Sequence, residues 1–372
     1  MQLGFVDLFS CGGGMSSGFA RQGSFVPLGA VDLEVAKPSH GIGATGCNAT
    51  YHANVGLEPL SADLSVADPD EISSHFGFTA ADIDVLISCA PCTGFSQKQS
   101  RNHVSDDPRN QLVERTAVFA AAWKPKYVVI ENVKELLKGR HNHHFHGLHR
   151  SLTGLGYEVF AEVHDLKNFG LPQSRIRSLI IAKLGDRFDL AIPAVTRLRT
   201  VRDAIGHLPS LRAGETNPDD PMHVCPNMGE ASMARMRAIP RDGGSWTDLT
   251  ESQAHLRIPS MNVNKPGSFP DIYGRLAWDK VAPTVTRECS HPGNGRYSHP
   301  EQDRLLSVRE MALLQGFPAD YQFLGSLSFK YRQIGDAVPP MIAAQIANAI
   351  AADAAGRYTA PDPAGGQMAL AV

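Results

Sequence analysis

Short apolar runs alternate with helical periodicity along the first half of the chain. The apolar runs at 3–9, 25–31, 84–88 and 127–130 predict buried strands. Helical spacing of apolar positions from about residue 15, at 48–54 and at 111–122 predicts helices between these strands. This alternation favours an α/β fold with a doubly wound, mostly parallel sheet, whose ligand sites lie beyond the carboxyl ends of the strands.

The pattern changes after about residue 185. Residues 186–274 are rich in Pro, Gly, Asp and Arg and show weak periodicity, which predicts a small, irregular domain. Regular patterning returns from about 275 and ends in an amphipathic helix at about 338–352. We therefore expect a sheet domain formed by 1–185 and 275–354, a small domain formed by 186–274, and a disordered tail at 355–372.

Composition limits the class of protein. The 372 residues are 42% hydrophobic and 20% charged, as in an ordinary globular protein, and no run of about 18 apolar residues could span a membrane. The N-terminal residues lack the pattern of a secretory signal, and the six irregularly spaced cysteines are typical of reduced thiols, so we expect a cytoplasmic protein. A net charge of −3 neither indicates nor forbids nucleic-acid binding, which depends on local charge placement.

A glycine-rich turn follows the first predicted strand. A strand that leads through glycines into a helix lets the backbone approach a nucleotide-like ligand closely, although an ordinary turn accounts for the glycines equally well. The candidate cofactor-binding residues in this turn are Phe9, Ser10, Gly12, Gly13 and Gly14.

Two acidic residues further along could hold other parts of such a ligand. Asp32 follows the second strand, where a carboxylate typically accepts hydrogen bonds from ribose hydroxyls, and a solvated acidic loop is the alternative. Asp63 is a weaker candidate for contact with the base of the ligand, and a plain turn residue is the simpler interpretation.

Cys92 lies just past the third strand and follows Pro91, which fixes the preceding backbone, so it is placed well for a nucleophile. An inert buried thiol is the alternative. Cys89 and Cys92 could also form a redox or zinc pair, but the chain has no second Cys-x-x-Cys. The polar loop that follows suits closure over phosphates, and its candidate contacts are Ser96, Lys98 and Arg101.

Two further motifs follow in the chain. Glu131 ends the fourth strand and would share a cleft with Cys92 in a parallel sheet, where it could carry a proton and donate to a ring nitrogen. A helix-capping acid is the alternative. Arg175 and Arg177 alternate onto one side of an extended segment and could hold a base carbonyl and a phosphate, unless both are simply solvated.

Five histidines lie between residues 141 and 149. His141 and His144 could share a helical face, but the next position on that face is Leu148. His143 and His146, or His146 and His149, could also share a face, but they lack a third acidic or cysteine partner nearby in the sequence. We therefore expect a solvated polar face here and no bound metal.

Taken together, these motifs resemble the DNA cytosine-5 methyltransferase family, of the bacterial or phage restriction-modification type. The resemblance covers roughly residues 3–183 and 274–352. The order of the motifs along the chain is that of the family: Asp7-Leu8-Phe9 with Gly13-Gly14, Pro91-Cys92 with Phe95-Ser96, Glu131-Asn132-Val133, Gln173-x-Arg175-x-Arg177, residues 304–318, and the segment 333–340.

The resemblance implies a Rossmann-like methyltransferase that uses S-adenosylmethionine to methylate C5 of a flipped-out cytosine in a specific double-stranded DNA sequence. Cys92 would attack C6, Glu131 would bind N3 and the exocyclic amine, and Arg177 would hold O2. Arg175 would position the loop and Glu131. The chemistry implied needs no metal.

The resemblance also extends to the rest of the chain. Segment 186–274 becomes the target recognition domain, and its candidate DNA contacts are Arg235, Arg237 and Arg241. Asp336 and Ala337, in the last motif, would join the cofactor-binding residues. We expect a monomer that acts on DNA without membrane contact, with a cognate restriction endonuclease as a possible partner.

Three positions depart from the family pattern. Cys11 stands where the family usually has glycine, and we expect Gly12 to take up the turn instead. Asp336 replaces the favoured asparagine and so loses an amide donor, and Thr93 replaces a frequent glutamine. A tRNA cytosine-5 methyltransferase of related fold and a catalytically silent DNA-binding paralogue stay open as alternatives.

Overall fold

The computed structural model describes residues 2–35, 43, 45–91, 94–95, 106–262 and 270–357. Contacts between residues divide the chain into two compact units. Unit 1 consists of Met1–Phe169, Ile176–Ala194 and Val338–Val372, and unit 2 consists of Gly170–Arg175 and Val195–Ala337. No helix among the described residues is long and apolar enough to cross a membrane.

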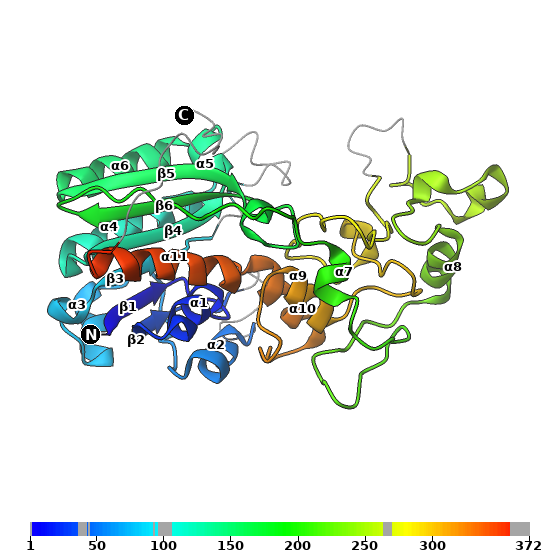
Figure 1. Ribbon diagram of the computed structural model, residues 1–372, viewed down its shortest axis with the longest axis horizontal. Helices are drawn as coiled ribbons and strands as arrows, with labels where there is room; N and C mark the ends of the chain where they lie inside the picture. The colour runs from blue at the N-terminus through cyan, green and yellow to red at the C-terminus, as the bar shows by residue number, and fades with distance from the viewer. Residues whose placement is uncertain are drawn as a thin grey trace. The chain divides into compact units, whose positions relative to one another are not determined.

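Unit 1 is built around a six-stranded sheet of order β2-β1-β3-β4-β6-β5 (Figure 1). Neighbours among the first four strands in this order pair in parallel, whereas β6 runs antiparallel to both β4 and β5. The sheet confirms the predicted α/β, mostly parallel class. The strands are β1 (Leu3–Leu8), β2 (Phe25–Val31), β3 (Val85–Ser88), β4 (Tyr127–Val133), β5 (Tyr157–Asp165) and β6 (Ile176–Leu184).

Helices of unit 1 pack on the sheet because the central strands are apolar on both faces and would otherwise expose them to water. Helix α1 packs against α11, and α4 packs beside α6 (Figure 1). Gly18 allows the close approach of α1, since a Cβ there would lie 2.4 Å from that of Ala343. The helices are α1 (Gly14–Gln22), α2 (Cys47–Val55), α3 (Pro69–Phe76), α4 (Leu112–Trp123), α5 (Glu135–Lys138), α6 (His143–Gly154) and α11 (Pro340–Ala354).

Unit 2 has little regular structure in its described part, where short helices alternate with turns and isolated bridges. Its helices are α7 (Val201–Ile205), α8 (Glu230–Ala238), α9 (Val308–Leu314) and α10 (Leu327–Asp336). The unit includes residues 275–337, which we had expected to belong to the sheet domain, while 186–194 belong to unit 1. The assignment of 186–274 to target recognition stays a prediction.

Buried arginines explain why residues 275–337 belong to unit 2. Arg275, with no exposed surface, donates to the carbonyl oxygens of Met236 and Ile239 at the end of α8, and also to those of His299 and Gln302. One guanidinium therefore ties segments that are far apart in the sequence, because each of its donors must find an acceptor once it is removed from water.

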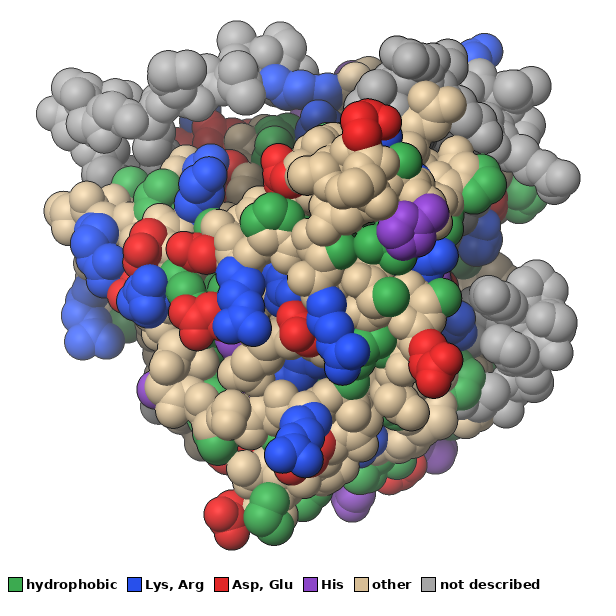
Figure 2. Space-filling model, turned by 90° about the vertical axis from the view of Figure 1, so that its right-hand side faces the viewer, with side chains coloured by type: hydrophobic (Ala, Val, Ile, Leu, Met, Phe, Trp, Pro, Cys, Tyr) green, Lys and Arg blue, Asp and Glu red, His purple; other side chains and the backbone are tan. Residues whose placement is uncertain are grey.

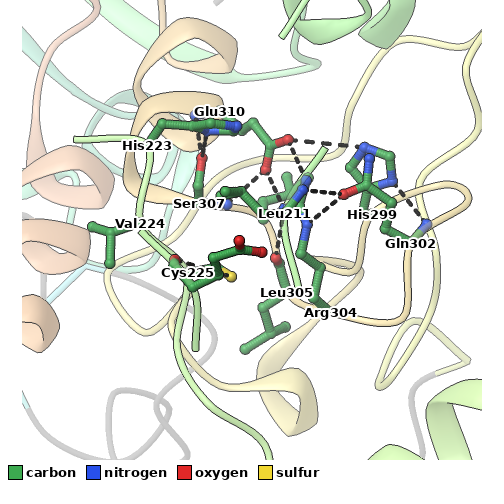
Figure 3. A network of polar contacts seen from close by, with 12 residues as sticks. Leu211, His223, Val224, Cys225, His299, Gln302, Arg304, Leu305, Ser307 and Glu310 are labelled. Carbon is green, nitrogen blue, oxygen red and sulfur yellow. Dashed lines mark hydrogen bonds and ion pairs between the residues drawn. The ribbon is translucent and has the colours of Figure 1, made fainter. Parts of the chain in front are cut away.

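A second buried arginine lies at the start of α9. Arg304 donates two hydrogen bonds, of 2.7 and 2.8 Å, to the carboxylate of Glu310, and neither side chain is more than 1% exposed (Figure 3). Glu310 also accepts the backbone N–H of Ser307, in a capping box that begins the helix. The pair is thus both a helix cap and a buried ion pair.

Candidate active site

The glycine-rich turn between β1 and α1 contains three left-handed residues. Phe9, Cys11 and Gly13 have φ of 60°, 45° and 82°. The expectation that Gly12 would take up the turn was therefore wrong, because Cys11 itself adopts the left-handed conformation. Two hydrogen bonds fix it there: the N–H of Cys11 donates to Asp32 Oδ2 over 2.9 Å, and that of Gly13 donates to the Ser10 carbonyl. Holding a non-glycine residue in this region costs about 1–2 kcal/mol.

A buried chain of hydroxyl groups supports the turn from behind. Ser16 Oγ donates to Asp7 Oδ2 over 2.5 Å, and the Tyr51 hydroxyl donates to Ser16 Oγ over 2.8 Å. Burial raises the pKa of Asp7 to about 7, against the lowering effect of the Ser16 hydrogen bond. Sequence reasoning assigned no role to Ser16 or Tyr51, since only the fold brings β1, α1 and α2 together here.

The turn fits a nucleotide-like cofactor. The Ser10 hydroxyl is buried and has no hydrogen-bond partner among the described residues. Helix α1 begins after Gly13 with no side-chain cap and no acidic residue in its first turn, so its first backbone N–H groups are available to an acceptor on a ligand. Gly12 and Gly14 are buried within the same turn.

The acidic candidates after β2 differ in their surroundings. Both carboxylate oxygens of Asp32 accept a backbone N–H, from Cys11 and from Glu34, yet each oxygen has a second lone pair for a ligand hydroxyl. Asp63 is exposed and accepts a hydrogen bond from the N–H of Ser65 within a turn, which is the environment expected of a plain turn residue. Cofactor contact by either residue stays a prediction.

Cys92 and Thr93 lie outside the described residues, as do Ser96, Lys98 and Arg101. The segment that leads to Cys92 is among the described residues. It leaves β3 at Ser88, and the carbonyl oxygen of Ala90 accepts a hydrogen bond of 3.1 Å from Asn132 Nδ2 at the end of the neighbouring strand β4. Asn132 therefore connects the segment before Cys92 to the strand that contains Glu131. Its position next to Glu131 in the sequence could have suggested this role.

Glu131 and Arg177 meet on adjacent strands. Arg177 Nε lies 3.0 Å from Glu131 Oε1, and both side chains are largely buried. Despite this contact, Glu131 Oε1 makes no hydrogen bond of good geometry with any described residue. A buried carboxylate oxygen that is charge-paired but not hydrogen-bonded is available to a ligand donor.

Cys89 is unsuited to redox or metal chemistry. Burial raises the pKa of its thiol well above the usual range, and the negative charges of Glu131 and Asp7 add to this effect. The thiolate, which is the nucleophile and metal ligand, is therefore disfavoured at this position.

Arg175 occupies a different environment from Arg177. It is 2% exposed and donates to the carbonyl oxygens of Val285 and Ala337, at 3.0 and 3.1 Å, and of Gly335 at 3.4 Å. Within unit 2 it thus fixes the segment that carries the last predicted motif. The expected influence of Arg175 on Glu131 stays a prediction.

The last motif ends α10. Arg287 Nε lies 3.3 Å from Asp336 Oδ2. Removal from water raises the pKa of Asp336 to about 6, whereas the positive charges of Arg287 and Arg175 lower it. About 35% of the Asp336 side chain is exposed. The carbonyl oxygen of Ala337 accepts from Arg175 and from Gln315. Contact of Asp336 or Ala337 with the cofactor stays a prediction.

The arginines expected to contact DNA lie in or just after α8. Arg235 donates to the Leu256 carbonyl oxygen over 2.7 Å and lies over the Tyr273 ring. Its guanidinium group therefore makes contacts within unit 2. Arg237 and Arg241 are exposed. Figure 2 shows Lys and Arg side chains interspersed with acidic ones over one face of the molecule.

The histidine run has an acidic partner that the sequence did not reveal. Asp106, far earlier in the chain, lies 3.1 Å from His143 Nε2 and 2.9 Å from His144 Nε2. His144 is buried, so the expectation of a wholly solvated polar face was wrong.

A glycine-rich turn after the first strand of a doubly wound sheet, followed by acidic residues beyond the next strand, is the arrangement of a Rossmann-like fold that binds a nucleotide-like cofactor. Residues 3–352 match the model of a family described as C-5 cytosine-specific DNA methylase. The chain therefore belongs to this family, and its substrate is DNA.

Curated relatives agree with this assignment, and a solved structure shares the fold. The chain is 34% identical over 353 residues to a type II methylase, M.HgiDII of Herpetosiphon aurantiacus, covering 93% of this chain and 94% of that protein. It is 35% identical to a type II methyltransferase, M1.HphI of Haemophilus parahaemolyticus, covering 94% and 87%. A DNA modification methyltransferase encoded within a prophage (E. coli) shares the fold, with a TM-score of 0.64 at 24% identity over 93% of this chain and 97% of its own.

Proposed function

We propose that this chain methylates C5 of a flipped-out cytosine through a covalent bond between Cys92 and C6 of the base. Membership of the family confirms S-adenosylmethionine-dependent cytosine-5 methylation of DNA as the activity. The roles of individual residues, the reading of a specific double-stranded sequence, and the state in which the protein acts are our proposals.

Cytosine C5 is a poor nucleophile until C6 is attacked. The Cys92 thiolate forms the S–C6 bond, and the displaced π electrons pass to C5, which then attacks the methyl group that the bound cofactor supplies. Glu131, which must carry a proton for this step, donates it to N3 and accepts from the exocyclic amine, and so stabilises the charge that develops on the ring. Arg177 holds O2. Loss of the C5 proton to a base and rupture of the S–C6 bond release 5-methylcytosine and the thiolate.

The observation that carries this proposal is the state of Glu131. Its carboxylate is buried at the end of β4, paired with Arg177 and left with an oxygen free of hydrogen bonds among the described residues. A base edge would supply the missing donor. Asn132, the next residue, donates to the carbonyl oxygen of Ala90, so one hydrogen bond joins the strand that carries Glu131 to the segment that leads to Cys92.

Covalent trapping tests the proposal. Duplex DNA that contains 5-fluorocytosine should form an SDS-stable adduct with the protein in the presence of S-adenosylmethionine, because fluorine at C5 cannot leave as a proton. Cys92→Ser should abolish the adduct, whereas the control Cys89→Ser should retain it. An adduct that survives in Cys92→Ser would refute the assignment of the nucleophile. An adduct on tRNA alone would favour the RNA methyltransferase, and none on either substrate would favour the silent paralogue.

We also propose that the segment 186–274 reads the DNA sequence, with the exposed Arg237 and Arg241 as its phosphate or base contacts. Because its relatives include type II methylases, we propose a cognate restriction endonuclease as a partner, and we further propose that the chain acts as a monomer in the bacterial cytosol. Bisulfite sequencing of a plasmid methylated by the protein would identify the site. An endonuclease that this methylation blocks would establish the partner, and sedimentation equilibrium would establish the monomer.

A further inference from the structure

Three histidines converge on one carboxylate in unit 1. Asp106 Oδ2 lies 3.1 Å from His143 Nε2 and 2.9 Å from His144 Nε2, and Asp106 Oδ1 lies 3.7 Å from His141 Nδ1. One ligand atom from each of Asp106, His143 and His144 lies within 4.8 Å of the others. The histidines come from the beginning of α6 and the turn before it, and Asp106 comes from the segment before a short 3₁₀ helix, Pro108–Gln111.

The spacing of these atoms suits a small metal ion. Tetrahedral Zn²⁺ with bonds of about 2.0–2.1 Å to nitrogen and oxygen places neighbouring ligand atoms about 3.3 Å apart. The two distances from Asp106 Oδ2, 2.9 and 3.1 Å, are a few tenths of an ångström shorter, so a small rotation of the exposed His143 side chain would admit the ion.

A second observation points to the same chemistry. His144, with a side chain only 4% exposed, directs Nε2 at Asp106 and has Nδ1 2.8 Å from Glu114 Oε1 on α4. A carboxylate behind a histidine fixes its tautomer and orients the ring, and this arrangement accompanies most metal-binding histidines. Asp106 is held in turn by Asn110, whose Nδ2 donates to its other oxygen over 2.6 Å.

We propose that Asp106, His143 and His144 bind a divalent transition metal, of which Zn²⁺ is the best fit, with a water molecule as the fourth ligand. The chemistry of methyl transfer needs no metal, so the ion is structural. It reverses our expectation from the sequence that the histidines bind none.

A metal ion at this site would also restrict the backbone at Gly94, two residues after Cys92. Asn110, which holds Asp106, leaves no room beside Gly94, because a Cβ there would lie 2.1 Å from Asn110 Oδ1. An ion on Asp106 would therefore lock the 3₁₀ helix, and with it the backbone two residues after Cys92, onto α4 and α6. Metal binding itself does not depend on the role of Cys92.

Metal titration of the full-length chain without a polyhistidine tag tests the proposal. After treatment with a chelator and desalting, calorimetry with Zn²⁺ should give one ion per chain, and Co²⁺ should give the visible absorption of a four-coordinate site. His143→Ala, whose side chain is exposed, and Asp106→Asn should remove this binding. Glu114→Gln should weaken it about 10- to 100-fold.

His146→Ala, an exposed position on the same helix, is the matched control and should bind the ion as the parent chain does. Circular dichroism confirms that each variant is folded. A folded parent chain that binds no Zn²⁺ would overturn the proposal, since the cluster would then be an imidazole–carboxylate hydrogen-bond network alone. Zn²⁺ binding that persists in both His143→Ala and Asp106→Asn would overturn it as well.

Discussion

Replacing Glu310 with glutamine removes the negative partner of a fully buried arginine. Arg304 donates two of its hydrogen bonds to the Glu310 carboxylate, while its Nε donates to Gln302 Oε1 over 2.8 Å and Nη1 to the Leu305 carbonyl oxygen (Figure 3). In Glu310→Gln the guanidinium keeps its charge, loses one of the paired hydrogen bonds, and faces an amide N–H₂ that cannot accept.

The size of the effect follows from the burial of the pair. Opposite charges whose centres are about 4 Å apart interact by about 4 kcal/mol at an effective dielectric constant of about 20. Breaking a buried ion pair on one side costs about 3–5 kcal/mol, because the remaining charge is left without compensation. We expect Glu310→Gln to lower the free energy of unfolding of unit 2 by this amount.

Urea unfolding followed by tryptophan fluorescence measures the loss. Two of the three tryptophans, Trp246 and Trp278, are buried in unit 2 and report on it. Asp279→Asn is the matched control: it breaks an ion pair with Arg202 of 2.8 Å whose side chains are 54% and 76% exposed, and it should leave the unfolding midpoint unchanged.

The pH dependence gives a second readout. Burial opposes ionisation of Glu310, but the hydrogen bonds and charge of Arg304 outweigh it and lower the pKa of the carboxyl group. The stabilisation is therefore fully present above the ordinary glutamate pKa of about 4.3 and is lost as pH falls through the lower value of the folded state. Glu310→Gln should lack this acid-dependent component. If Glu310→Gln lowered the free energy of unfolding by less than about 1 kcal/mol at pH 7, the buried ion pair would not have the stabilising role assigned to it.

The remaining predictions concern catalysis, acid stability and DNA binding. Glu131→Gln should lower kcat about 10²- to 10⁴-fold in a methyl-transfer assay while DNA affinity in a filter-binding assay changes little; an unchanged kcat would exclude Glu131 from base activation. Burial lowers the pKa of His299 to about 4, so the unfolded chain binds an extra proton between pH 6.5 and 4 and stability falls across that window. His299→Asn keeps the acceptor for two backbone N–H groups and should flatten this fall in acid titrations. Arg237→Ala and Arg241→Ala should each weaken DNA binding and reduce the salt dependence by about one unit of slope, whereas Arg235→Ala should lower the unfolding midpoint instead.

Strands β1, β3 and β4 could be predicted from the sequence because they are buried on both faces and so appear as uninterrupted apolar runs, whereas β5, which is only partly buried, was not predicted. The helix predicted at 48–54 is α2 (Cys47–Val55), and the one predicted at 338–352 is α11 (Pro340–Ala354). Glu131 was found for a related reason: it directly follows an uninterrupted apolar run, although β4 itself continues to Val133.

Other features depend on contacts between segments that are distant in the sequence. Asp106 meets His143 and His144 only because α6 packs beside α4, and no local spacing indicates this. The same holds for Arg275 and Arg304, which look like ordinary surface arginines in the sequence but are buried and tie unit 2 together. Residues 275–337 therefore pack with the irregular segment.

The two arginines of the Gln-x-Arg-x-Arg motif show how far alternation can mislead. Spacing of two predicted that Arg175 and Arg177 would act from one side of a strand. Strand β6 begins only at Ile176, so alternation applies to Arg177, which pairs with Glu131, and not to Arg175. Arg175 is instead enclosed by carbonyl oxygens of unit 2. Because its buried donors need acceptors, the hydrogen bonds from Arg175 to the carbonyl oxygens of Val285, Gly335 and Ala337 fix the backbone at the end of α10.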